Sequence, residues 1–326
     1  MRNLLTVSIC CAAAVLITSC KTKPAGPRKT TIAVIPKGTT HSFWKSVHAG
    51  AVKASKELGV DIIWKGAMKE DDLEGQTKVV EDIIVRGVDG IVIAPLHHGP
   101  ALQIQVKNAK RNGIPTVIID SGLGGSEYVS FVATDNFKGG QLGGEHLAKL
   151  LGGKGKVVMM RYHEGSASTE NREAGFLDAM KKQSGIEVIS DNQRGGDIER
   201  SMKTAENLMP KLREADGVFC PNETTTFGML RALENAGLAG KIKFVGFDSN
   251  AKLVDALSKK HIHGLVLQDP INMGYMGVKT MVNHLKKQKV EARVDTGCTV
   301  ATPENMNEEK IDGLLNPDYK KWLEEE

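Results

Sequence analysis

Short runs of apolar, β-branched residues alternate along most of this chain with longer segments whose apolar residues recur at helical spacing. The first run, "TIAVIP", is followed by a helix expected to run through Leu58 and to stop at Gly59. The runs "VDIIW", "GIVIAP" and "TVIID" follow in the same way, separated by helices that end near Gly87 and Gly113. Continuous apolar strands separated by helices are typical of a parallel sheet that is buried on both faces. The pattern therefore predicts an α/β fold built from βαβ units.

The alternation restarts at "YVSFVATD" and continues through "KVVMM", "EVIS", "GVFC" and "KFVGFD". Helices are expected over residues 136–151, 168–182, 197–212, 224–236 and 250–259. One open sheet with so many strands would be unusually wide, so two successive Rossmann-like lobes are predicted. Near the end, "IHGLVLQD" and "CTVATPEN" are expected to be strands on either side of a helix over residues 270–286. The chain is expected to cross between the lobes near Ala133, Gln268 and Ala301, which would form a three-segment hinge.

The first twenty residues have the pattern of an export signal, with Arg2 followed by an apolar run over residues 4–17 that is too short to span a membrane. The following "ITSC" resembles a bacterial lipobox, so Cys20 is the predicted lipid-bearing residue; a non-lipidated signal cleaved nearby is the alternative. The polar stretch "KTKPAGPRKT" is expected to be a tether. The predicted parts are thus a signal (1–20), a tether (21–30), an N-terminal lobe (31–132 plus 269–299) and a C-terminal lobe (133–268 plus 300–326). The protein is expected in the periplasm or at the cell surface, anchored to a membrane as a lipoprotein.

Charge and cysteine content exclude several classes of protein. The formal net charge of +4 is spread over 326 residues without a dense basic block, which does not favour nucleic acid or an anionic membrane surface as a partner. Cys10 and Cys11 would leave with the signal and Cys20 would carry lipid. Cys220 and Cys298 are too few for a disulfide framework or a zinc site of CxxC type. Two buried thiols are expected there, and a single bond between them is the alternative.

The polar and aromatic residues that follow predicted strands form a consistent set. In open α/β sheets, ligands bind beyond the carboxyl ends of the strands. The residues found at these positions are His41, Phe43, Trp44, Asp120, Ser121, Arg172, Asn222, Asp248 and Gln268. Carboxylates, a guanidinium, amides and aromatic rings suit a neutral ligand that is rich in hydroxyl groups. Since neighbours on a helix point about 100° apart, at least one of Phe43 and Trp44 should face the crevice.

Other sites with a recognisable sequence pattern are not indicated. The turn after the first strand lacks G-x-G-x-x-G, and neither a phosphate-binding P-loop nor a G-x-S-x-G nucleophile elbow occurs. His97 and His98 have no suitably spaced metal-ligating partner, so they are expected on a loop surface or at the rim of the cleft. Asp135 is expected to cap a helix. Asp120 and Asp248 could form an acid and base pair, but a nearby Arg172 would keep both ionised. No enzyme, cofactor or metal site is therefore predicted.

From about residue 31 to residue 305 the sequence resembles the ribose-binding branch of the bacterial periplasmic binding proteins of type I, which share a core with LacI-type proteins. The motifs that carry the resemblance include "TIAVIPKGTTHSFWKSVHAGAVKASKELG", "VATDNFKGGQLGGEHLAK", "VFCPNETTTFGMLRALENAG", "FVGFDSN" and "LQDPINMGYMG". The resemblance implies two lobes joined by three crossovers, a sugar enclosed between them, and delivery of that sugar to an ABC permease in the membrane.

The resemblance also assigns roles to residues. It implies ring stacking by Phe43 and Trp44 and sugar contacts by Asp120, Asp248, Arg172, Asn222 and Gln268. Three positions depart from the ribose binders: His41 replaces an Asn, Ser121 replaces an Arg, and Gly196 stands where a second-lobe aromatic residue would complete the ring sandwich. Each departure alters a ribose contact, so the implied ligand class is a monosaccharide, a polyol or a related small polar molecule.

The function predicted from the sequence is therefore that of a monomeric extracytoplasmic binding protein that passes its ligand to an ABC permease. A binding protein that presents a sugar or another small signal to a chemoreceptor or a sensor kinase is the alternative. A LacI-like transcription regulator would need an N-terminal helix-turn-helix, and an export signal occupies that part of this chain.

Overall fold

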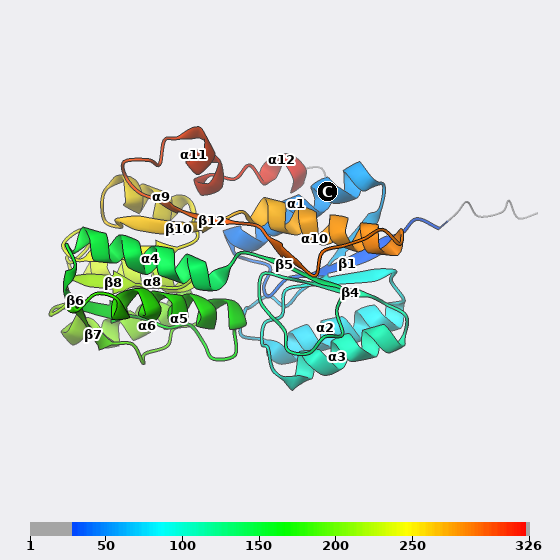
Figure 1. The fold of residues 1–326 in the computed structure, drawn as a ribbon, viewed down its shortest axis with the longest axis horizontal. Coiled ribbons are helices and arrows are strands. Elements are labelled where there is room, and N and C mark those ends of the chain that lie inside the picture. The colour runs from blue at the N-terminus through cyan, green and yellow to red at the C-terminus, as the bar shows by residue number, and fades with distance from the viewer. Residues whose placement is uncertain (1–27, 324–326) are drawn as a thin grey trace, which may run out of the picture.

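Two α/β lobes lie side by side along the long axis of the molecule (Figure 1). The computed structural model describes residues 28–323. The predicted export signal, most of the tether and the predicted lipidation site Cys20 lie outside the described residues. No helix within residues 28–323 has the length and apolar character needed to cross a membrane.

The first lobe contains a six-stranded sheet with the order β11-β5-β4-β3-β1-β2, in which all neighbouring strands are parallel. Its strands are β1 (Thr31–Ile35), β2 (Asp61–Trp64), β3 (Gly90–Ile93), β4 (Thr116–Ile119), β5 (Ser130–Ala133) and β11 (Arg293–Asp295). Its helices are α1 (Ser42–Leu58), α2 (Leu73–Arg86), α3 (Pro100–Arg111) and α10 (Pro270–Leu285). Ile32 and Val34 belong to one core with α1 and α10, whereas Ala33 and Ile35 belong to a second core with α2 and α3. Both faces of the sheet are thus buried, as the continuous apolar runs predict.

The second lobe repeats this plan with the sheet order β12-β10-β9-β8-β6-β7. Its strands are β6 (Lys154–Met159), β7 (Gly185–Ser190), β8 (Gly217–Phe219), β9 (Lys243–Phe247), β10 (Gly264–Gln268) and β12 (Cys298–Ala301). Its helices are α4 (Asn136–Leu150), α5 (Ala167–Lys181), α6 (Ile198–Asn207), α7 (Met209–Leu212), α8 (Glu223–Asn235), α9 (Ala251–Ser258) and α11 (Glu309–Leu315). Only the edge strand β12 runs antiparallel, against β10. The predicted two-lobed α/β fold with parallel sheets is therefore confirmed.

The chain passes from one sheet to the other after β5, after β10 and between β11 and β12. β5 continues to Ala133 and β12 begins at Cys298, one or two residues from the predicted lobe limits. Since these passages do not establish how the lobes move, the hinge and the precise lobe limits stay predictions. Cys220 is buried and Cys298 is half-buried, and both are free thiols.

The C-terminal segment makes a further connection between the lobes. In α11, Ile311 and Leu315 belong to the core of the second lobe. The chain then reaches the first lobe, where α12 (Lys320–Leu323) packs against α1 and the Lys56 ammonium lies 5.8 Å from the centre of the Trp322 ring. Figure 1 shows α11 above the second lobe and α12 beside α1. This passage is absent from the sequence prediction, which places residues 300–326 in one lobe.

Candidate ligand-binding site

Two buried carboxylates occupy equivalent positions in the two lobes. Asp120 follows β4 and Asp248 follows β9, and each of these is the fourth strand of its lobe in chain order. Both residues have left-handed backbone conformations, with φ of 60° for Asp120 and 66° for Asp248. This conformation is costly for residues other than glycine and is concentrated at functional sites. The fold therefore directs one carboxylate from each lobe toward the interface between them.

Arg172, near the start of α5, lies between these two carboxylates. Its Nη2 atom is 4.0 Å from Asp120 Oδ1, and its Nη1 atom is 3.8 Å from Asp248 Oδ2. Nε donates a hydrogen bond to Asn136 Oδ1 at 2.8 Å, and Nη1 donates to the Pro221 carbonyl at 3.0 Å. Nη2 is buried and has no hydrogen-bond partner among residues 28–323. The guanidinium is thus held in place by two bonds and keeps one donor free for another molecule.

Close packing of α4 against α5 fixes the backbone that carries Arg172. A Cβ atom on Gly140 would lie 1.9 Å from the carbonyl oxygen of Arg172, a distance that no side chain tolerates. The Arg172 guanidinium also lies over the Phe247 ring, 4.0 Å from its centre. The side chain therefore has little freedom to move away from the two carboxylates.

The second lobe surrounds Asp248 with donors. Gln268 Nε2 donates to Asp248 Oδ1 at 2.7 Å, and the backbone N–H of Glu223 donates to Asp248 Oδ2 at 3.1 Å. Burial nevertheless raises the pKa of Asp248, although Arg172 and Gln268 oppose this shift. The pKa of Asp248 is thus shifted upward, and the ionisation of both aspartates beside Arg172 stays a prediction. Asn222 caps α8, where its Oδ1 accepts a bond from Thr225 N at 3.3 Å.

Phe43 and Trp44 both line the cavity between the lobes, so the prediction that at least one ring faces the crevice is confirmed. The two rings meet edge to face, with centroids 4.9 Å apart. Trp44 is only 2% exposed and also belongs to the core shared by α1 and α10. Phe43 is half-buried, and its backbone N–H donates to Glu223 Oε2 across the lobe interface at 3.4 Å. Trp44 thus has a structural role in addition to its place in the cavity wall.

Glu70 is the centre of a hydrogen-bond network that joins the lobes. Its carboxylate accepts bonds from the Trp44 indole N–H and from the Tyr162 hydroxyl, the latter at 2.8 Å from the second lobe. His41 Nδ1 lies 3.3 Å from the same carboxylate. Burial disfavours the imidazolium, but the hydrogen bond and charge of Glu70 outweigh it and raise the pKa of His41 to about 9. Burial likewise opposes ionisation of Glu70, yet His41 lowers the pKa of Glu70 to about 2, so the two form an ion pair.

Lys37, just beyond β1, makes a second connection between the lobes. Its ammonium group is buried, forms an ion pair with Asp120 Oδ2 at 2.9 Å, and donates to Ser168 Oγ at 3.0 Å and to Ser166 Oγ at 3.3 Å. Asp120 belongs to the same lobe as Lys37, whereas both serines belong to the other lobe. Closure of the lobes is therefore favoured by a buried cation that contacts both of them.

These residues enclose one interlobe cavity, which in this closed conformation has a volume of about 30 Å³. Every predicted site residue lines it except Ser121: His41, Phe43, Trp44, Asp120, Arg172, Asn222, Asp248 and Gln268. Ser121 is fully buried, and its Oγ accepts a bond from the Ser168 N–H at 3.1 Å across the interface. Its contact is thus with the opposite lobe and not with the cavity.

The structure adds lining residues that sequence reasoning missed, namely Lys37, Glu70, Tyr162, Ser168, Thr169 and Glu223. Lys37 and Tyr162 follow β1 and β6, so the rule that selected the other residues could have found them. Glu223 is adjacent to Asn222, and burial raises the pKa of Glu223 to about 7. Glu70 lies in the long loop after β2, away from the end of the strand, so its position in the sequence does not mark it as a site residue. Tyr162 places a second-lobe ring at the cavity even though Gly196 lacks one.

Two minor predictions concern residues outside the cavity. The backbone N–H of His98 donates to the Gly165 carbonyl at 2.9 Å, and His98 Nε2 lies 3.2 Å from Glu170 Oε2, which places this residue at the rim between the lobes as expected. Asp135 caps α4 by accepting a bond from Lys138 N at 3.0 Å, which confirms the predicted cap. No group of three or more metal-ligating side chains occurs within residues 28–323.

The chain is similar to known proteins over most of its length. Residues 32–289 match the family model described as a periplasmic binding protein domain. The D-ribose/D-allose-binding protein of Pseudomonas aeruginosa is 29% identical over 298 residues, which cover 87% of this chain and 93% of that protein. A solved carbohydrate transporter solute-binding protein from Agrobacterium radiobacter in complex with D-arabinose is 36% identical, with a TM-score of 0.83 and coverage of 88% of this chain and 99% of that one.

An ABC transporter solute-binding protein from Agrobacterium vitis with bound D-fucose is also similar, at 33% identity and a TM-score of 0.81, over 87% of this chain and 99% of that one. The Pseudomonas protein is named for binding D-ribose and D-allose, and the two Agrobacterium proteins are solute-binding proteins of transporters with a bound sugar. These relatives are binding proteins and not enzymes, in agreement with the prediction of a binding function. The chain belongs to the periplasmic binding protein family.

Proposed function

We propose that the protein binds a monosaccharide or a related polyol between its lobes and delivers it to an ABC permease in the membrane. The observation that carries this proposal is the cluster of Asp120, Arg172 and Asp248, in which equivalent strands of the two lobes place carboxylates on either side of one guanidinium. Carboxylates accept hydrogen bonds from neighbouring sugar hydroxyls, and Nη2 of the guanidinium, which has no hydrogen-bond partner among residues 28–323, can donate to one of them. The similarity to sugar-binding relatives supports the same ligand class.

Ligand entry requires separation of the lobes. A volume of about 30 Å³ is close to that of a single water molecule in the liquid, so a sugar does not fit the closed cavity. The Tyr162 bond to Glu70 and the Lys37 bond to Ser168 join the lobes and must break as they open. A sugar bound between the lobes would take over part of these contacts, which favours a closed, ligand-bound conformation.

The membrane anchor is a separate part of the proposal. Lipid attached to Cys20 would hold the protein close to the permease, and the polar residues that follow would act as the tether. Mass measurement of the N-terminal peptide tests this assignment, with loss of the lipid mass expected for Cys20→Ser. An N-terminus produced by cleavage at another residue would refute it.

A thermal-shift screen tests sugar binding with D-ribose, D-allose, D-arabinose and D-fucose at millimolar concentrations. A sugar present at about 100 times its Kd stabilises the folded state by roughly 2.7 kcal/mol, which raises the melting temperature by several degrees. The Asp248→Asn variant should lose most of this rise. A protein purified after unfolding and refolding that responds to none of these sugars, nor to a wider panel of polyols, would refute the proposed ligand class. Co-purification with a sensor ectodomain and not with a permease would instead favour signalling.

A further inference from the structure

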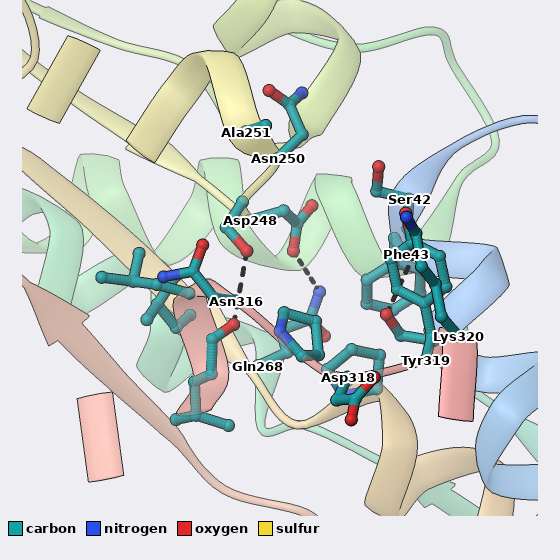
Figure 2. Close-up of a pocket in the computed structure, with 17 residues that line it drawn as sticks. Ser42, Phe43, Asp248, Asn250, Ala251, Gln268, Asn316, Asp318, Tyr319 and Lys320 are labelled. Carbon is teal, nitrogen blue, oxygen red and sulfur yellow. Dashed lines mark hydrogen bonds between the residues drawn. The ribbon is translucent and has the colours of Figure 1, made fainter. Parts of the chain in front are cut away.

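A second and larger pocket lies between the lobes, beside the C-terminal segment. We call it the tail pocket; residues 314–320 form one of its walls, and its volume is about 450 Å³. Figure 2 shows Phe43, Tyr319 and Lys320 together on one side of this pocket, with Asp248, Asn250 and Asn316 on the other. Pockets of roughly 300–1,000 Å³ are typical of small-molecule sites. The tail pocket thus has the size of a ligand subsite, while the adjoining interlobe cavity contains most of the polar site residues.

The two spaces adjoin each other. Phe43, Asp248 and Gln268 line both the tail pocket and the interlobe cavity. Gln268 is 4% exposed, and its Oε1 atom has no hydrogen-bond partner among residues 28–323 although its Nε2 atom is bonded to Asp248. A buried amide oxygen without a partner is costly unless another molecule supplies a donor. The position of this acceptor, at the boundary of both spaces, favours a ligand that extends through that boundary.

The lining of the tail pocket suits a neutral group with both polar and apolar parts. Phe43 and Tyr319 contribute rings, Leu314 contributes apolar surface, and the amides of Asn250 and Asn316 contribute polar atoms. Asp318 and Lys320 carry opposite charges, and the third charged residue, Asp248, already accepts bonds from Gln268 Nε2 and the Glu223 N–H. Aromatic faces with a few amides and hydroxyls are the groups that bind a sugar ring or a sugar-linked aromatic group.

The wall of the tail pocket depends on both lobes. Leu314 and Leu315 belong to α11 on the second lobe, whereas Lys320 begins α12, which packs against α1 of the first lobe. Between them, residues 316–319 cross from one lobe to the other next to the β10–α10 passage that contains Gln268. A group bound in this pocket would therefore contact both lobes when they are closed, through residues that do not line the interlobe cavity.

We propose that the tail pocket is a second subsite, which holds a neutral substituent linked to the sugar in the interlobe cavity, so that the preferred ligand is a glycoside or a disaccharide. This inference rests on the proposed function, because the sugar in the interlobe cavity positions the substituent. The anomeric oxygen or a neighbouring hydroxyl of that sugar would lie near Gln268, and the substituent would lie against Phe43 and Tyr319.

Calorimetric titration of the purified protein tests the subsite. The probes are D-ribose, D-allose, D-arabinose and D-fucose, each compared with its own α- and β-methyl and α- and β-phenyl glycosides. The expected result is that one phenyl glycoside binds at least about tenfold more tightly than its parent sugar, which corresponds to about 1.4 kcal/mol. Binding of a parent sugar with every glycoside at least about tenfold weaker would overturn the subsite and leave the proposed function intact. Failure of all probes, parent sugars included, would count against the proposed function itself.

Variants in the tail assign any gain to this pocket. Tyr319→Ala should remove most of the glycoside's advantage and leave the affinity for the parent sugar within about twofold, whereas Tyr319→Phe should keep the advantage because the ring remains. Lys321→Ala is the control, since Lys321 lies next to Trp322 and does not line the pocket. If Tyr319→Ala still bound the glycoside more tightly than the parent sugar by the same factor as the unmodified protein, the substituent would lie elsewhere and the proposal would be overturned.

Discussion

Replacement of Arg172 with lysine would show how much the interlobe cluster depends on the guanidinium fork and how much on charge alone. Lysine keeps the positive charge but provides one ammonium group in place of the planar fork. In the protein, Arg172 bonds to Asn136 Oδ1 at 2.8 Å and to the Pro221 carbonyl at 3.0 Å, and these two acceptors are reached by different nitrogen atoms. A single ammonium in this buried position is not expected to satisfy both acceptors and also to face two carboxylates.

The magnitude follows from these contacts. Loss of one hydrogen bond to a charged group costs about 1.5–3 kcal/mol, so the free energy of unfolding of Arg172→Lys should fall by about that amount. The bound sugar would additionally lose the donor at Nη2, which has no hydrogen-bond partner within the described chain. A further loss of about 1.5–3 kcal/mol in binding corresponds to a rise in Kd of roughly 10- to 150-fold.

Urea denaturation and calorimetric titration with the tightest-binding sugar measure the two effects separately. Arg231→Lys is the matched control, because Arg231 is an exposed residue of α8 outside the interlobe cavity. A Kd within threefold of that of the unmodified protein would refute the role of Arg172 in ligand binding. If the unfolding free energy fell at the same time, Arg172 would be a structural residue that connects α5 to the loop before α8.

Three further predictions concern stability and are measured by urea denaturation. Gly140→Ala should lower the free energy of unfolding by about 1–3 kcal/mol or more, because the new Cβ would lie 1.9 Å from a carbonyl oxygen. Gly313→Ala is the control and should not lower it, because a Cβ at that position has no atom within 4 Å. Equal effects of the two substitutions would refute the close-packing argument. Trp44→Ala should cost about 3–5 kcal/mol as well as sugar affinity, and a loss below about 1 kcal/mol would remove Trp44 from the core. Glu223 should contribute less to the free energy of unfolding as pH rises from 4.5 through about 7, because the folded protein keeps its proton longer than the unfolded chain does, and His41 should contribute less from 6.5 to about 9 for the same reason. The difference in free energy of unfolding between the unmodified protein and Glu223→Gln, or His41→Gln, should therefore decrease as pH rises through the range of that residue, and a difference that does not change with pH would contradict the assigned pKa shift.

Most of the fold could be predicted because strong local signals coincide with its elements. The helix expected to stop at Gly59 does so, with Gly59 in the left-handed conformation at φ 68°. The helix expected over residues 197–212 is instead divided into α6 and α7, with Pro210 in the first turn of α7. Proline fits a first turn but removes a donor and clashes inside a helix, so this break could have been predicted. The apolar periodicity continues through the break, so periodicity alone predicts one continuous helix.

β11 and the crossing tail were not predictable in the same way. β11 has only three residues, "RVD", and two of them are exposed, so its pairing with β5 leaves no apolar pattern. The tail is held by particular tertiary contacts, such as Trp322 near Lys56, that occur between residues distant in the sequence. Short edge strands and terminal segments depend on such contacts more than on periodicity.

Some residues of the site could likewise be predicted from the sequence and others could not. The shared strand order of the two lobes places Asp120 and Asp248 at equivalent strand ends, so residues directly beyond strands could be selected from sequence. Glu70, by contrast, reaches the cavity from a loop. Its bond to Tyr162 and its ion pair with His41 link three separate loops, and none of these partners identifies the others in the sequence. The sheet plan thus places one carboxylate from each lobe at the cavity, whereas the loops and the tail supply the residues that would select among the proposed ligands. Ligand identity is therefore best sought by varying Glu70, Tyr162 and Tyr319 while the two aspartates stay in place.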